Sequence, residues 1–113
     1  MGDILDKIRD ERLRDLLKLY RESPNNFTLV DILNYFRVNF WVDAMDAVMP
    51  KFEVDGERVY LGGLISGGQM FGVFLDVQEQ TVSLHIETQY YMVLTRENKT
   101  GGGDHDKRNN KPD

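Results

Sequence analysis

The chain has 113 residues, of which 41% are hydrophobic and 29% charged, with a formal net charge of -5 and no cysteine. This length fits one small domain, and the lack of cysteine excludes disulfides, thiolate metal ligands and cysteine nucleophiles. No apolar stretch approaches the roughly 18 residues that a membrane span requires, and the charged N-terminus does not resemble a secretory signal. We therefore expect a small, soluble, acidic and cytoplasmic domain.

Charge divides the chain into three zones. Residues 1–22 carry six acidic and six basic residues, whereas residues 23–96 carry nine acidic and four basic residues and supply the whole net charge. From residue 97 onward there is no hydrophobic residue, so this segment cannot bury enough surface to offset the entropy cost of ordering. The sequence predicts one domain over residues 1–96 and a flexible, disordered polar tail over residues 97–113.

The first zone has the pattern of an amphipathic helix. Apolar residues from Leu5 to Tyr20 gather on one stripe, and charged residues occupy the opposite face. Asp10 and Arg14 have the spacing of an i,i+4 ion pair. The helix should end before Pro24, because the residue that precedes a proline avoids the helical region.

A second helix is expected to begin near Thr28, because Thr28 and Asp31 resemble a capping box and apolar residues recur at helical spacing up to Phe36. Residues 38–49 fit either a continued helix or a strand, since aromatic and β-branched residues favour strands. The sequence leaves that choice open. Either structure would bury Trp41.

From Lys51 onward the hydrophobic period changes to two residues, which is typical of strands. Asp55-Gly56 and Gly67-Gly68 have the composition of two-residue hairpin turns, and a further turn is expected around residues 78–80. A strand should follow from residue 81 to residue 95, with a bulge or a change of environment near residues 88–91. The fold class is α+β: two N-terminal helices followed by an antiparallel meander of about four strands.

The hairpin turns also fix an expected register. The first turn would set Glu53 opposite Arg58, and the second would set Leu61 opposite Phe74. It would also place Gly63 opposite Gly72, where paired glycines leave a shallow depression or, as we expect, mark a bulge.

In this register one sheet face is apolar throughout, and the other is polar at one end and apolar at the other. A sheet with one face open to water should alternate cleanly, so the apolar end of the second face needs a cover. We expect a helix, a second copy of the chain or a protein partner to cover it. The predicted partner-binding residues are Tyr60, Leu64, Phe71, Val73 and Leu75.

His85 and Glu87 are the residues most similar to a catalytic pair, because an imidazole beside a carboxylate can act as a general base. They lie two residues apart on one strand face, which separates them by about 7 Å at the backbone. A solvated polar face explains the pair without catalysis. We therefore predict no catalytic residue, no metal ligand and no cofactor.

These observations favour a small acidic, non-catalytic protein-interaction module, such as an adaptor, an inhibitor or an immunity-type protein, which binds a protein partner or forms a homodimer through its apolar sheet face. The acidic middle zone argues against nucleic-acid binding, which needs a basic surface. The alternative is a small-ligand-binding domain or a minor enzyme with a pocket between helices and sheet. Its possible pocket residues are Trp41, His85, Glu87 and Tyr90.

Overall fold

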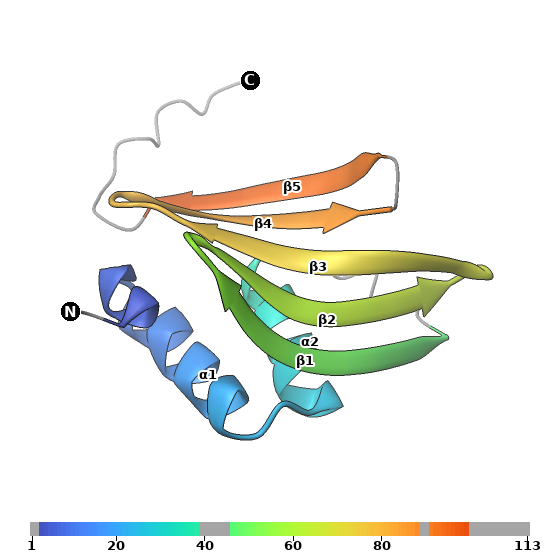
Figure 1. Ribbon diagram of the computed structural model, residues 1–113, viewed down its shortest axis with the longest axis horizontal. Helices are drawn as coiled ribbons and strands as arrows, with labels where there is room; N and C mark the ends of the chain where they lie inside the picture. Colours follow the sequence, from blue (N-terminus) through green and yellow to red (C-terminus); the bar gives the residue numbers. More distant parts are fainter. Residues whose placement is uncertain (1–2, 39–45, 89–90, 100–113) are drawn as a thin grey trace.

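The computed structural model describes residues 3–38, 46–88 and 91–99, and it confirms the predicted α+β architecture (Figure 1). A short 3-10 helix precedes two α-helices, and five strands form one antiparallel meander in the order β1-β2-β3-β4-β5. No helix in the described ranges has the length and apolar character that crossing a membrane would take. The elements are the 3-10 helix Ile4–Lys7, α1 Glu11–Glu22, α2 Asn26–Tyr35, β1 Ala47–Asp55, β2 Arg58–Ser66, β3 Gln69–Val77, β4 Thr81–Glu87 and β5 Met92–Lys99.

The predicted first helix is interrupted at Asp10, which caps α1 instead of lying inside a longer helix. The Asp10 carboxylate accepts a hydrogen bond from the Leu13 amide at 3.1 Å, as N-cap residues do. The expected Asp10–Arg14 ion pair is therefore wrong. Arg14 instead donates to the carbonyl oxygen of Ile8 at 2.9 Å.

The second helix begins at Asn26, two residues before the expected start. The side chain of Asn25 caps it by accepting from the Thr28 amide at 2.9 Å, so the cap is an asparagine and not the predicted capping box. Of the ambiguous segment over residues 38–49, the C-terminal part from Ala47 is strand β1. Trp41 lies outside the described residues.

The strand predicted from residue 81 to residue 95 is two strands, which raises the number from about four to five. Strand β5 returns antiparallel to β4, and at the two ends of their connection, near the expected irregularity, the Tyr91 amide donates to Thr88 Oγ1 at 2.9 Å. Strand β5 then runs to Lys99, so residues 97–99 belong to the sheet and not to the tail. Pairing with β4 orders this hydrophilic segment, because backbone hydrogen bonds do not depend on side-chain polarity. Residues 100–113 lie outside the described residues.

One hairpin register is confirmed and one is wrong. Gly67-Gly68 is the predicted two-residue loop, with φ angles of 59° and 77°. In the first hairpin, Asp55 pairs with Arg58, so the loop is shifted by one residue to Gly56-Glu57. Glu53 consequently lies opposite Tyr60 and not opposite Arg58.

A β-bulge in β2 changes which side chains share a face. The register shifts between Tyr60 and Gly62, so Phe74 lies opposite Tyr60 and not opposite Leu61 as predicted. Gly63 does pair with Gly72, as expected. The Tyr20 hydroxyl stabilises this distortion from the helix side, because it donates to the Leu61 carbonyl oxygen at 2.5 Å and accepts from the Lys51 amide at 3.0 Å.

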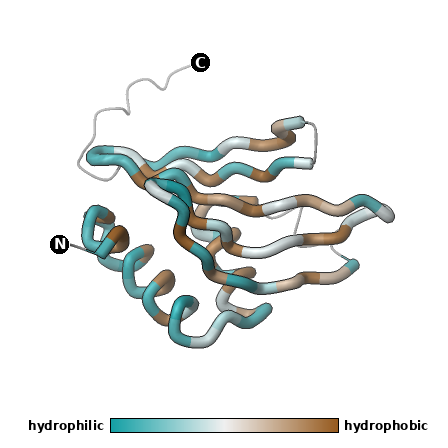
Figure 2. Tube along the Cα trace, in the orientation of Figure 1, coloured by the Kyte–Doolittle hydropathy of each residue, from teal (hydrophilic) through white to brown (hydrophobic). Residues whose placement is uncertain are grey.

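Both helices lie on one side of the sheet, and the core fills the space between the two layers (Figure 1). Along the strands, hydrophobic residues alternate with more hydrophilic ones, so the sheet supplies one apolar face to this core (Figure 2). The buried side chains that the strands contribute are Val59, Leu61, Leu64, Phe71, Val73, Leu75, Val77, Val82, Leu84 and Ile86.

This arrangement corrects the expected exposure of the apolar sheet patch. Leu64, Val73 and Leu75 have no solvent exposure and Phe71 is 8% exposed, because the helices of the same chain cover them. Of the predicted partner-binding residues, only Tyr60 has its side chain on the opposite face, where it pairs with Phe74.

Candidate functional site

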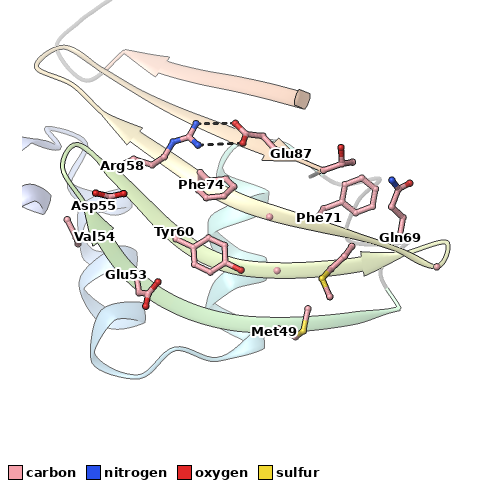
Figure 3. A pocket seen from close by; sticks show the side chains of 15 residues that line it. Met49, Glu53, Val54, Asp55, Arg58, Tyr60, Gln69, Phe71, Phe74 and Glu87 are labelled. Carbon is pink, nitrogen blue, oxygen red and sulfur yellow. Dashed lines mark hydrogen bonds and ion pairs between the residues drawn. The ribbon is translucent and has the colours of Figure 1, made fainter. Parts of the chain in front are cut away.

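The candidate site lies on the sheet face that no helix of the described ranges covers (Figure 3). This face contains a groove of about 1210 Å³ over β1, β2 and β3. We call it the open-face groove. Its lining combines apolar and aromatic side chains with charged ones: Met49, Tyr60, Met70 and Phe74, together with Glu53, Asp55, Arg58 and Glu87.

Two glycines form the floor of the open-face groove. Gly63 and Gly72 lie opposite each other on β2 and β3 and leave the backbone uncovered by side chains of their own. A Cβ atom on Gly72 would lie 2.8 Å from Phe74 Cε1, and one on Gly63 would lie 3.1 Å from Met49 Cε. The glycines therefore allow large side chains to lie close against the sheet.

The aromatic side chains in the groove are held by packing against each other and against a cation. The rings of Tyr60 and Phe74 have centroids 5.2 Å apart and planes tilted by 41°. The Arg58 guanidinium carbon lies 4.5 Å from the centroid of the Phe74 ring, which is cation–π geometry. The positions of these side chains are thus fixed before any ligand arrives.

Arg58 is held at one end of the groove by two carboxylates. Its Nε donates to Asp76 Oδ1 at 2.8 Å, and a terminal nitrogen donates to Glu87 Oε2 at 3.1 Å (Figure 3 shows the pair with Glu87). The hydrogen bond to Asp76 is the main cause that raises the pKa of Arg58, with Glu87 adding to it. This arginine is therefore a fixed structural cation rather than a free one.

His85 and Glu87 lie on the same face of β4, as predicted, but the structure gives them different partners. His85 Nε2 lies 2.9 Å from Asp76 Oδ2, and its Nδ1 lies 3.3 Å from Met92 Sδ. Glu87 pairs with Arg58. Both residues are on the open face, so the predicted pocket between helices and sheet is not where they lie.

The other two predicted pocket residues, Trp41 and Tyr90, lie outside the described residues. Within the described ranges, no group of three or more His, Asp or Glu residues is arranged to hold a metal ion. Asp76 joins Arg58 to His85 in one polar cluster across β2, β3 and β4. This arrangement can position charges and aromatic rings for binding.

Sequence reasoning did not assign Met49, Glu53 or Arg58 to a site. Met49 was missed because the structure of residues 38–49 was left open. Glu53 and Arg58 were assigned to one face, as the structure has them. The bulge in β2 was not predicted, however, so buried residues such as Leu64 and Leu75 were assigned to that face in place of Met70 and Phe74. A strand register that slips by one residue exchanges the two faces. The adjacent glycines Gly62-Gly63 were the available signal, since glycine inside a strand often marks a bulge.

Comparison of the chain with protein-family models, with curated proteins and with solved structures found no match.

Proposed function

We propose that this protein is a non-catalytic interaction module that binds a protein partner in the open-face groove. The observation that carries the proposal is the groove itself: a preformed hollow with aromatic and methionine side chains on a sheet face that none of the described helices covers. Aromatic residues and methionine are enriched where protein interfaces gain binding energy. The side chains that line it are held in place, which lowers the entropy cost of binding.

Charge indicates what kind of partner fits. The carboxylates of Glu53, Asp55 and Glu87 line the groove. Lys51 pairs with Glu53 at 3.3 Å and Arg58 pairs with Glu87, so Asp55 is the lining carboxylate without an ion pair among the described residues. The chain as a whole has a net charge of -5. A segment that presents an apolar side chain flanked by lysine or arginine would match both the apolar floor and the acidic rim. A second copy of this chain would instead bring a like-charged rim against the first.

The test uses two exposed apolar residues as a matched pair. Met70 lies at the groove and is 62% exposed, and Leu19 lies on α1 and is 58% exposed. We expect Met70→Arg to repel a basic partner and block the groove, whereas Leu19→Arg adds the same charge elsewhere. Proteins captured from a lysate by the wild type are purified, and their binary affinity for all three forms is measured by isothermal titration calorimetry at low and high salt.

The proposal predicts a purified partner whose affinity falls at least about tenfold with Met70→Arg, hardly changes with Leu19→Arg, and decreases with salt. Equal affinity for both variants would contradict it. A wild-type dimer that Met70→Arg converts to a monomer would assign the groove to a second copy. A small molecule that binds the groove and raises the melting temperature, with no protein partner dependent on Met70, would favour the small-ligand alternative.

A further inference from the structure

A second pocket lies on the helix side of the sheet, where α1 begins, α2 ends and β5 passes. It has a volume of about 640 Å³, and three arginines from these three segments line it. These are Arg12 in the first turn of α1, Arg37 just after α2, and Arg96 on β5. We call it the arginine pocket. It shares no lining residue with the open-face groove.

The three guanidinium groups have no carboxylate in direct contact among the described residues, although Asp10 lies near enough to Arg12 for the charge of Arg12 to help lower the pKa of Asp10. Within the described residues, Arg12, Arg37 and Arg96 form no ion pair within 4.0 Å, although the protein is acidic overall. One carboxylate, Glu97, belongs to the lining. Glu97 pairs with Ser83, which places its side chain on the opposite face of the sheet from Arg96. The pocket therefore concentrates positive charge.

Arg37 occupies a backbone conformation that normally favours glycine. Its φ angle is 64°, and it is the residue after the C-cap of α2. The Val38 amide donates to the Leu33 carbonyl oxygen at 3.1 Å and the Arg37 amide donates to that of Asn34 at 2.9 Å, which together form a Schellman motif. A side chain at this position strains the backbone, and such strain is commonly found at functional sites.

Arg12 also occupies a position that disfavours its charge. It is the second residue of α1, where the positive end of the helix dipole opposes a cation. Two of the three arginines thus reduce local stability at their positions, yet they line the same pocket. This coincidence indicates a use for their charge that folding alone does not explain.

A hydrogen-bonded frame holds the pocket together. The Tyr35 hydroxyl donates to Asp10 Oδ2 at 2.6 Å and accepts a hydrogen bond from the Asn98 amide, which links α1, α2 and β5. Burial raises the pKa of Asp10, but hydrogen bonds from Tyr35 and the Leu13 amide outweigh it, so the pKa is lowered overall. Asp10 is therefore an ionised carboxylate already occupied by two donors.

We propose that the arginine pocket binds the phosphate group of a small phosphorylated molecule. Guanidinium groups bind phosphate oxygens through paired, charge-assisted hydrogen bonds, and three of them can surround one phosphate. The volume exceeds that of a phosphate ion alone and is within the range of small-ligand sites, so room remains for the rest of the molecule. A nucleic acid does not fit, because the net charge of -5 opposes an extended polyanion.

The test is an NMR titration of the full chain with inorganic phosphate, glycerol 3-phosphate and citrate, repeated with three variants. Arg37→Gly removes one guanidinium and relieves the backbone strain, so we expect phosphate affinity to fall about tenfold while the melting temperature rises by a few degrees. Arg12→Gln should weaken binding without lowering the melting temperature. Lys18→Gln is the control, because Lys18 is a cation on α1 outside the pocket lining, 3.8 Å from Asp6.

The proposal predicts tighter binding of glycerol 3-phosphate than of citrate, and amide shifts centred on residues 34–38 and 96–98. Unchanged phosphate affinity in Arg37→Gly and Arg12→Gln would overturn it. An equal loss in Lys18→Gln would also overturn it, because binding would then follow overall charge. Tighter binding of citrate than of glycerol 3-phosphate would overturn the assignment to phosphate.

Discussion

The two faces of the sheet are built from alternate residues of the same five strands, yet they differ in composition and in surroundings. The face toward the helices supplies side chains such as Leu75 and Leu84 that have no solvent exposure. The open face carries Tyr60, Phe74 and Met70 beside a cluster of ion pairs. Burial of the first face supplies the hydrophobic driving force for folding. The side chains of the second face do not have that role, so they can be the ones that bind a partner.

The sharpest way to test this difference is to truncate neighbouring residues of β4 that point to opposite faces. Leu84 is fully buried, and Leu84→Ala should lower the free energy of unfolding by about 4 kcal/mol, because it leaves a cavity in the core. Ser83→Ala, on the open face, should change it by less than about 0.5 kcal/mol. Urea denaturation of both variants measures the difference. Similar losses would mean that the faces are not distinct in packing.

The bulge that assigns side chains to the two faces depends on Gly62. Its φ angle is 114°, and a Cβ atom there would lie 2.2 Å from the Met49 carbonyl oxygen. Gly62→Ala should therefore destabilise the domain by about 3 kcal/mol, since both backbone strain and a steric clash oppose it. Gly67→Ala is the control: Gly67 also has a positive φ but open space around it, so the loss should be about 1 kcal/mol. Equal melting temperatures for the two variants would refute the role of the bulge.

Tyr20 joins the helix layer to this bulge, so its hydroxyl should contribute to stability. Tyr20→Phe removes the partner of the Leu61 carbonyl and the Lys51 amide and should cost about 2 kcal/mol. Burial raises the pKa of Tyr20 from 10.0 to about 12. The Tyr20 hydroxyl therefore loses its proton at a lower pH in the unfolded chain than in the folded one. The free energy that this hydroxyl contributes to folding should decrease as the pH rises from 10 to 12.

The check is denaturation at several alkaline pH values. The difference in unfolding free energy between wild type and Tyr20→Phe should shrink across that window. A difference that stays constant with pH would contradict the assignment of the raised pKa to Tyr20.

Apart from the control variants, the smallest effect is expected on the open face, in the polar cluster. Asp76→Asn removes the charge that joins Arg58 to His85 and should cost about 1 kcal/mol, because all three side chains are partly exposed. High salt should reduce the difference, since ions screen exposed pairs. Thermal melting at low and high salt measures both effects. A loss as large as that of Leu84→Ala would mean that the cluster belongs to the folding core.

The fold class and most elements could be predicted because they depend on local patterns. The period of two in β4 places Val82, Leu84 and Ile86 on one face, and the structure agrees. The Gly67-Gly68 loop was predictable because two consecutive positive φ angles favour glycine.

The bulge in β2, and with it the match between the faces of β2 and β3, could not be predicted because it depends on an interaction between segments far apart in the sequence. The bulge at Leu61 is stabilised by Tyr20, 41 residues earlier, and no local pattern reveals that contact. The reversal between β4 and β5 was expected only as an irregularity, because the hydrogen bond that the Tyr91 amide donates to Thr88 Oγ1 gives a weak sequence signal. The predicted partner-binding residues were wrong for the same reason, since a shift of one residue moves Leu64 and Leu75 from surface to core.

The central claim is that the open face is uncovered in the free protein and becomes covered by a partner. The most direct measurement is methyl NMR of the methionines with a soluble paramagnetic agent, over a dilution series. We predict that the Met49 and Met70 methyl signals are strongly broadened at every concentration and become protected when the basic, apolar partner is added. Protection of both methyls in the free protein, whether constant or lost on dilution, would contradict the claim.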